Sequence, residues 1–283
     1  MNIKITADST CDLSPQIIAE QNIDLVPLYV NKDGSFYRDG VDITPADIFA
    51  HVAAGGSLCS TAACNVEDYA RRFQPLSQQY DGVIHISLGG DFSSSYQNAC
   101  IAAADYPNVR VIDSRNLSTG QGHVVMEACK LAKTMDDLDA IAAELNDLTG
   151  RVETSFLLDR LDYMVKGGRC SMVAALGANL LQLKPSIEVA DGKMRVCKKY
   201  RGSFSKSIVS YVKDRLKDRD DIIRDRVFIT HTPCDDKALA EVRRTVDEYG
   251  RFPTVMETNA GCTISCHCGP GCLGVLFIRK KQS

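Results

Sequence analysis

The sequence predicts an α/β fold of two domains, and two observations carry this prediction. Short apolar segments of the length and pattern typical of strands, such as residues 3–7 and 82–88, alternate with longer segments of helical character. Several of the longer segments open on a residue that caps helices, and two continue with proline at the first helical position. Alternation of strand and helix favours a parallel or mixed sheet covered by helices.

In the first half of the chain, strands are expected over residues 3–7, 23–30, 82–88 and 109–113. Helix starts are indicated by Ser14 before Pro15, by Thr44 before Pro45, and by Asn65. The helices are expected over residues 14–21, 44–56, 65–76, 94–105, 122–133 and 134–150. Three polar loops, at residues 8–14, 91–97 and 113–122, follow strands, where sheets of this kind place their binding loops.

The second half of the chain has a different pattern, and a domain boundary is predicted near residue 155. Strands are expected over residues 152–159, 226–232, 254–260 and 272–280, and a helix over 235–250. Residues 184–202 predict a hairpin, since Asp191-Gly192 favours a tight primed turn. Residues 172–183 are apolar on nearly every face and are expected to be buried. The prediction is an N-terminal domain (1–155) with a parallel or mixed sheet and a mixed α/β C-terminal domain (156–283).

The composition disfavours several functional classes. The chain has 33 Lys and Arg residues and 36 Asp and Glu residues, which gives a net charge of −3. Nucleic acid is therefore not an expected partner. No apolar run reaches the roughly 18 residues of a membrane span, and the first residues lack the apolar centre of a signal peptide. The 12 cysteines are therefore expected to be reduced thiols in a cytoplasmic protein, mostly acting as small buried hydrophobes.

Near the C-terminus, Cys262, Cys266, Cys268 and Cys272 surround His267. The spacing differs from the two separated Cys pairs of structural zinc sites, so no metal is expected and the thiols are interpreted as packing. A catalytic Cys/His pair is an alternative, but it requires hydrogen-bond contact that adjacency in sequence does not provide. The Gly-Pro-Gly that follows predicts a sharp turn, which can aim the imidazole into a cleft.

Two further polar segments are candidate ligand sites. Ser93, Ser94 and Ser95 stand between a strand and a helix, and they supply more hydroxyls than one helix cap requires. With the free N–H groups of the helix start they predict a cradle for a phosphate or a carboxylate. Ser60 and Thr61 precede the helix capped by Asn65, and alone they read as an ordinary turn.

Arg169 follows two glycines in the segment KGGRCS. Three roles are open to it: neutralising a bound anion, pairing with an acidic side chain, or docking a partner protein. The last two are favoured.

Seven segments, in this order, resemble the motifs of the DegV family. They are ADSTCDLS, STAAC, FSSSYQNA, VIDSRNLSTGQG, YMVKGGRCS, LKPSIEVADGKM and HCGPGCLGV. The resemblance covers nearly the whole chain. Where the family motif has Gly-Thr, this sequence has Ser94 and Ser95, and Ala62 and Ala63 replace a Gln-Pro pair.

The resemblance implies a DegV-like fold that holds one long-chain fatty acid, such as palmitate, between its two domains. Some members serve as the binding subunit of a bacterial fatty acid kinase and present the carboxylate for phosphorylation. The implied carboxylate-binding residues are Ser93 with Ser94, a hydroxyl of Ser60 or Thr61, and His267. No cofactor, no metal and no catalytic residue is implied, and the expected partners are the fatty acid and a kinase catalytic subunit.

Two other functional hypotheses stay open at this point. The first is an enzyme of acyl or phosphoryl chemistry that uses Ser93 as nucleophile and His267 as base, although no third orienting residue is identifiable. A long apolar pocket would favour the carrier, and a short polar pocket would favour the enzyme. The second is a metal-binding redox protein built on the last four cysteines.

Overall fold

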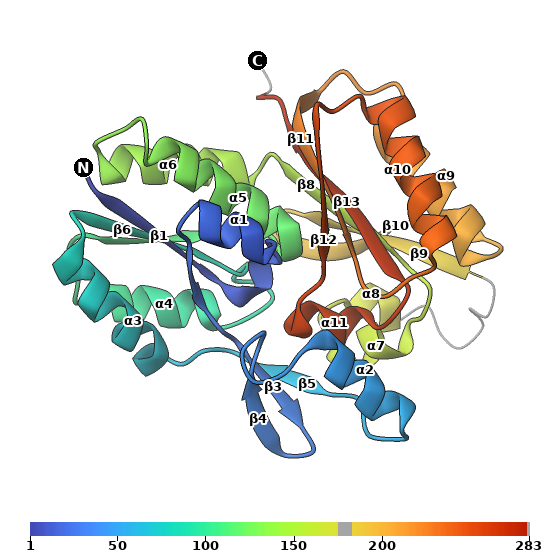
Figure 1. The fold of residues 1–283 in the computed structure, drawn as a ribbon, viewed down its shortest axis with the longest axis horizontal. Helices are drawn as coiled ribbons and strands as arrows, with labels where there is room; N and C mark the ends of the chain where they lie inside the picture. The colour runs from blue at the N-terminus through green and yellow to red at the C-terminus, as the bar shows by residue number, and fades with distance from the viewer. Residues whose placement is uncertain (175–182, 282–283) are drawn as a thin grey trace.

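The computed structural model describes residues 1–174 and 183–281, which form two lobes side by side (Figure 1). The first lobe is built on a parallel sheet of four strands in the order β2-β1-β6-β7. The strands are β1 (Ile3–Asp8), β2 (Asp24–Val26), β6 (Gly82–Ser87) and β7 (Val109–Asp113). Every residue of β6 is buried, as expected of a central strand covered on both faces. The predicted α/β class is confirmed.

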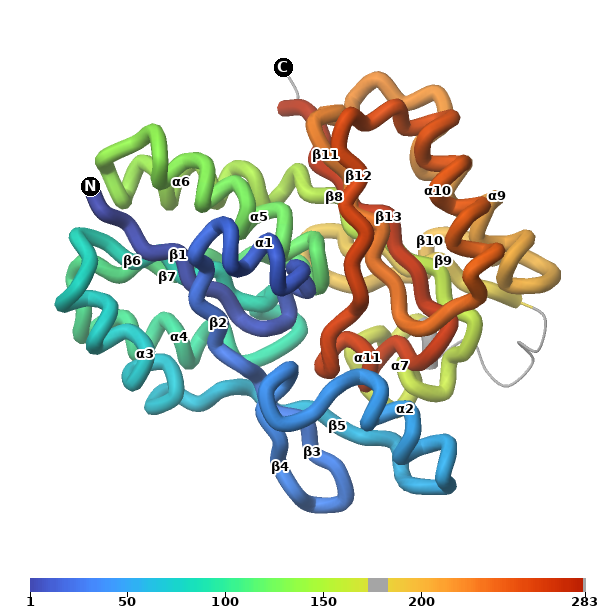
Figure 2. Tube along the Cα trace, viewed as in Figure 1, coloured from blue at the N-terminus to red at the C-terminus, as the bar shows by residue number. Residues whose placement is uncertain are grey.

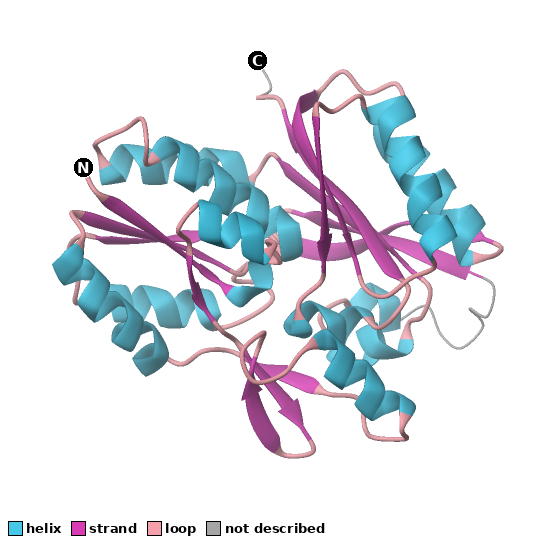
Figure 3. Ribbon diagram, viewed as in Figure 1, coloured by secondary structure: helices cyan, strands magenta, loops and turns pink. Residues whose placement is uncertain are grey.

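Helices cover both faces of this parallel sheet (Figure 3). On one face lie α3 (Val66–Gln79) and α4 (Ser95–Ala103), and on the other lie α5 (Ser118–Leu131) and α6 (Leu138–Thr149). The short η1 (Ser9–Cys11) and α1 (Pro15–Glu20) follow β1. The predicted helix caps are confirmed, because Thr44 and Asn65 each form a capping box and Ser14 Oγ accepts a backbone hydrogen bond.

The second lobe is built on a mixed sheet of six strands in the order β10-β9-β8-β13-β11-β12. These strands are β8 (Val152–Leu158), β9 (Leu183–Ala190), β10 (Lys193–Arg201), β11 (Ile222–His231), β12 (Thr254–Asn259) and β13 (Cys272–Arg279). α9 (Phe204–Leu216) and α10 (Asp236–Gly250) lie along its outer side, and α5 contacts β8, β11 and β13 from the first lobe. α5 is thus enclosed between two sheets, and all residues from Ser118 to Val125 are buried.

Two sequence predictions concern the second lobe. The hairpin of β9 and β10 is confirmed, with Asp191 at φ 52° and Gly192 at φ 77° in its turn, as a primed turn requires. The division into domains of residues 1–155 and 156–283 stays a prediction. Residue 155 lies inside β8, which pairs with β13 along its whole length.

A third sheet of three strands, which we call the small sheet, projects from the molecule beside α2 (Pro45–Ala53) (Figure 2). It consists of β4 (Ser35–Arg38), β3 (Tyr29–Lys32) and β5 (Ser60–Ala62), in that order, all antiparallel. The prediction of one strand over residues 23–30 was wrong. The chain leaves β2 at Pro27, which has no N–H to donate, and β3 belongs to the small sheet. β4 and β5 were not predicted.

Three short helices lie near the small sheet: α7 (Asp162–Gly167), α8 (Ser171–Ala174) and α11 (Cys262–Cys268). The sequence did not predict α11, and it placed a loop over residues 113–122 where α5 already begins at Ser118. Most of the apolar segment 172–183 that was expected to be buried lies outside the described residues, at 175–182. Within the described chain, none of the helices has the length and apolar character that a membrane crossing needs.

Candidate functional site

A cavity of about 150 Å³ lies where the two lobes meet the small sheet. Its apolar lining includes Leu28, Leu88, Phe92, Leu117, Phe156 and Ile264. Its polar lining consists of Thr61, Ser93, Ser94, Arg169, Thr263 and His267. Most of the apolar lining side chains belong to the core cluster that spans both lobes, and polar groups are a minority of the lining.

A second, smaller cavity of about 20 Å³ adjoins the first on the side of the mixed sheet. The two share Leu117, Phe156, Ile264 and Cys268 in their linings. The smaller cavity is bounded by residues of β8, β11 and β13. Together they form an apolar path from the polar groups toward the mixed sheet.

A larger cavity of about 290 Å³ has the opposite character. It lies near the start of β8 and is lined by Arg195, Arg215 and Arg279 together with Glu153 and Glu188. These groups pair with one another, as in the contacts of Arg215 with both glutamates. An alkyl chain would displace water from charges there without any compensating interaction, so this cavity does not suit an apolar ligand.

The serine loop lies between β6 and α4. The Oγ atom of Ser93 accepts a hydrogen bond from the backbone N–H of Ser95 at 3.1 Å and lies 2.9 Å from Ser95 Oγ. Ser93 and Ser94 both line the cavity, whereas Ser95 is fully buried beneath them. The predicted cluster of hydroxyls is therefore present at a helix start, with two of its three members at the cavity.

The strand β5 brings Thr61 but not Ser60 to the cavity. Successive residues of a strand face opposite sides, and Thr61 lies on the side toward α11 while Ser60 is exposed. Thr61 Oγ1 lies 2.8 Å from His267 Nε2, near the end of α11. The structure thus brings together Thr61 and His267, and it leaves Ser60 outside the lining.

His267 is held closely on its other side by α7. A Cβ atom at Gly167 would lie 2.2 Å from His267 Nδ1, so only glycine fits beside the imidazole as it stands. Nδ1 is buried and has no hydrogen-bond partner among the described residues. Burial, aided by the positive charge of Arg169, lowers the pKa of His267 to about 4, and the ring is neutral at neutral pH.

Arg169 stands at the cavity just after Gly168, which has φ 68°. The side chain is exposed, and its Nη1 donates a hydrogen bond of 2.7 Å to the carbonyl of Gly167. In the part of the chain that the structure describes, Arg169 forms no ion pair with an acidic side chain. Its charge is therefore available to a bound anion or to a partner.

The cysteines around His267 are packed in the interior. Cys262 and Cys266 belong to a small cluster with Cys59, Val30 and Ile48. Burial raises the pKa of both Cys262 and Cys266, which keeps these thiols protonated. Within the ranges that the structure describes, no three His, Cys, Asp or Glu side chains form a set that could hold a metal ion.

The turn after His267 has the conformation that the sequence indicated. Gly269 and Gly271 have φ of 69° and 74°, and a Cβ at Gly269 would lie 2.5 Å from the ring of Tyr163. The imidazole precedes this turn on the last turn of α11 rather than on an extended segment. Sequence reasoning missed Thr263 and Ile264, because no helix was predicted to bring them to the cavity.

Comparisons with known proteins cover nearly the whole chain. A family model described as "Uncharacterised protein, DegV family" matches residues 2–280. A DegV domain-containing protein of Caldanaerobacter subterraneus is 31% identical over 98% of this chain and 99% of its own. A structure described as fatty acid binding of a DegV family protein from Thermus thermophilus has a TM-score of 0.88 and 30% identity, covering 99% and 100% of the chains. A stearic acid-binding protein from Eubacterium ventriosum has a TM-score of 0.83 and 27% identity, covering 98% of each chain.

Proposed function

The chain belongs to the DegV family, and we propose that it binds one long-chain fatty acid in the cavity between its lobes. The observation that carries the proposal is the apolar cavity between the lobes, with its smaller neighbour, and with Thr61, Ser93 and His267 among its few polar groups. The solved relatives from Thermus thermophilus and Eubacterium ventriosum, which are described as fatty acid-binding, support it.

The carboxylate would lie among the hydroxyls of Ser93 and Thr61, with Ser94 beside them. Since His267 is neutral, one of its ring nitrogens carries a proton. An unpaired buried N–H is costlier than an unpaired acceptor, so the partnerless Nδ1 is best left bare and Nε2 protonated. Nε2–H then donates to Thr61 Oγ1, which frees the hydroxyl proton of Thr61 for the carboxylate.

The tail supplies most of the affinity. Burying each methylene contributes about 0.8 kcal/mol, or roughly 12 kcal/mol gross for a chain of about sixteen carbons, before the cost of association. Residues such as Leu117, Phe156 and Ile264 provide apolar contacts along the path. Neutral hydroxyls and an imidazole suffice for the head group, because a buried carboxylate needs hydrogen bonds but not necessarily a full counter-charge.

We further propose that the protein carries the fatty acid, or presents its carboxylate to a kinase subunit, without itself catalysing a reaction. The exposed Arg169, free of acidic partners among the described residues, supports a role beside the head group or in docking that subunit. The enzyme alternative requires His267 to act as a base on Ser93. It has less support, because the hydrogen bond of His267 Nε2 is with Thr61.

Native mass spectrometry of the protein, purified after growth with added fatty acid, tests the proposal. We expect one fatty acid per chain. In a titration, we expect palmitate, stearate and oleate to bind with higher affinity than short-chain acids. Absence of any bound acid, or equal affinity for acetate and palmitate, would overturn it.

A further inference from the structure

We propose that Asp39 is a positioning residue of the fatty acid site, because it holds α11, and with it His267, against the small sheet that carries Thr61. This inference rests on the proposed function. Asp39 itself is not among the described residues that line the cavity. Its effect on the ligand would be transmitted through the elements that it joins.

The carboxylate of Asp39 receives four hydrogen bonds, three of them from the start of α11. Oδ1 accepts from the backbone N–H of Cys262 at 2.9 Å, and Oδ2 accepts from the backbone N–H of Thr263 at 3.2 Å. Oδ2 also accepts from the hydroxyls of Thr263 at 2.7 Å and of Ser9 at 3.1 Å. Asp39 therefore caps a helix that begins 223 residues later in the chain.

A carboxylate suits this position for two reasons. The first N–H groups of a helix have no partner within the helix, and they carry the positive end of its dipole. Asp39 is only 4% exposed, and its hydrogen bonds come from N–H and hydroxyl groups. In the described part of the chain it forms no ion pair with Lys or Arg, so these N–H and hydroxyl donors are its polar partners.

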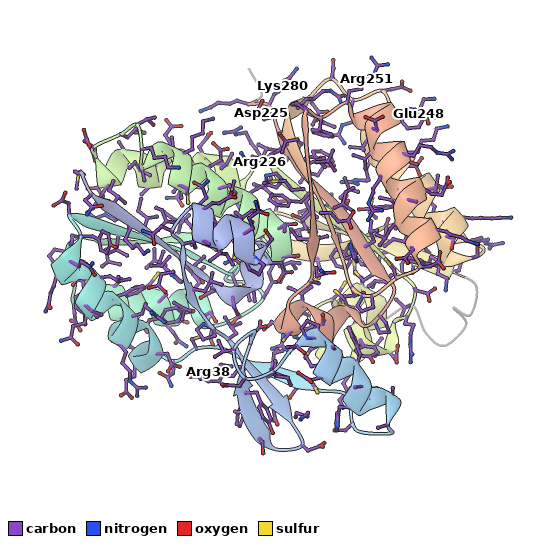
Figure 4. All side chains as sticks on the ribbon, in the orientation of Figure 1. Arg38, Asp225, Arg226, Glu248, Arg251 and Lys280 are labelled. Atoms are coloured by element: carbon purple, nitrogen blue, oxygen red, sulfur yellow. The ribbon has the colours of Figure 1, made fainter. Side chains whose placement is uncertain are left out.

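On its other side Asp39 is anchored to the base of the small sheet. Its backbone N–H donates to the carbonyl of Leu28 at 2.8 Å, and the N–H of Leu28 donates to Ser9 Oγ at 3.2 Å. Leu28 lines the cavity and directly precedes β3. Figure 4 labels Arg38, the neighbour of Asp39, at the end of β4 where the small sheet joins the rest of the molecule.

α11 transmits the position of Asp39 to the ligand site. The helix has seven residues, and it places Thr263, Ile264, His267 and Cys268 at the cavity. It contacts β3, β5, α2 and α7 (Figure 2). A shift at its capped end would move the imidazole at its other end away from Thr61, and the hydroxyl donor of the site would lose its orientation.

A double-mutant cycle with Asp39→Asn and Thr61→Val separates positioning from a general loss of stability. Asn keeps the shape of the side chain but replaces one carboxylate oxygen with an NH2 group. This group would face the N–H or the hydroxyl of Thr263, which donate to the carboxylate in the wild type. We expect Asp39→Asn to weaken palmitate binding about tenfold in the wild-type background and less than about twofold beside Thr61→Val. Asp42→Asn, which alters an exposed ion pair with Arg38 on the same segment, is the matched control and should leave affinity unchanged.

Nuclear magnetic resonance of the imidazole nitrogens gives a second measurement, which needs no ligand. We expect the Nε2 signal of His267 to change in Asp39→Asn and to stay as in the wild type in Asp42→Asn. Losses of affinity that add in the cycle, or an unchanged Nε2 signal, would overturn the inference. If Asp39→Asn does not fold, Ser9→Ala, which removes one donor to the same carboxylate, takes its place with a smaller expected loss.

The two proposals fail in different ways. If the wild-type protein binds no fatty acid, the proposed function fails, whereas the imidazole signal still tests whether Asp39 positions His267. If the wild type binds and Asp39→Asn binds equally well with an unchanged signal, only the positioning role fails.

Discussion

Thr61 Oγ1 and His267 Nε2 lie 2.8 Å apart although 206 residues separate them in the chain. Thr61 comes from the small sheet, and His267 comes from a helix that precedes the last strand of the mixed sheet. Both residues line the cavity, so the proposed head-group site requires the small sheet and α11 to be docked together. Affinity for the ligand should therefore report on that docking.

Thr61→Val tests the hydroxyl while keeping the shape of the side chain. Removing the hydroxyl leaves the carboxylate without this donor and the Nε2–H of His267 without its acceptor. We therefore expect affinity for palmitate to fall by about tenfold or more. Thr61→Ser should retain most of the affinity. Ser60→Ala is the neighbouring control, and an equal loss there would contradict the assignment of the hydroxyl to Thr61. Isothermal titration with palmitate measures all three.

Ser93→Ala should weaken fatty acid binding while the fold is kept. Hydrogen bonds to a charged group contribute about 1.5–3 kcal/mol, which corresponds to a loss of about tenfold to a hundredfold. The cost to stability should be near 1 kcal/mol, because the N–H of Ser95 loses its side-chain acceptor. Ser94→Ala, whose hydroxyl caps no helix N–H, provides the comparison. An unchanged affinity for Ser93→Ala, measured by titration beside urea unfolding, would refute its role.

The sequence predicted the elements whose signals are local. The caps at Thr44 and Asn65 and the turn at Asp191-Gly192 depend on a few adjacent residues, and all three are present. The cluster of serines after a strand also predicted the loop that lies at the cavity. Each of these signals acts over fewer than about five residues, so the chain far away has little influence on it.

The elements that depend on distant contacts were missed. α11 consists of Cys, Thr, Ile, Ser and His, which are only moderate helix formers, and its cap comes from Asp39. β5 has three residues and is a strand only because β3 pairs with it. The hydrogen bond of Thr61 with His267 could not be read from the sequence for the same reason, although the resemblance had implied both residues, with Ser60 as the alternative to Thr61, for one carboxylate site.

Gly167→Ala tests the close packing of the imidazole. Alanine normally favours a helix over glycine by about 1 kcal/mol, but here its Cβ would lie 2.2 Å from His267 Nδ1. We expect His267 to be displaced from Thr61 and affinity for palmitate to fall several-fold. Gly168→Asn is the adjacent control, since nothing lies within 4 Å of a Cβ there and Asn tolerates φ 68°. Equal affinities for both variants would show that the imidazole does not need this position.

The last prediction concerns Asp12, whose carboxyl group accepts a hydrogen bond from the N–H of Gly261 at 2.9 Å. Its Oδ2 lies 2.6 Å from Ser118 Oγ. Burial raises the pKa of Asp12 to about 8, with the nearby Asp39 adding to the effect. The thiols of Cys11, Cys262 and Cys272 also face it, and their own raised pKa values keep them neutral.

Because the folded protein holds this proton up to about pH 8 and the unfolded chain releases it near pH 4, the proton stabilises the fold fully below pH 4. That contribution declines as pH rises and is lost above about pH 8. Asp12→Asn resembles the protonated acid at every pH. Relative to the wild type, its free energy of unfolding should therefore rise with pH by up to about 1.4 kcal/mol per unit between pH 5 and 8.

Urea unfolding of both proteins at pH 5, 6, 7 and 8 measures this difference. His267, with its pKa lowered to about 4, contributes a slope of the opposite sign between its lowered value and the ordinary one. Since His267 is present in both proteins, its contribution cancels in the comparison. A difference that stays constant over this range would mean that Asp12 is ionised in the folded protein, and that the start of α11 does not hold this proton.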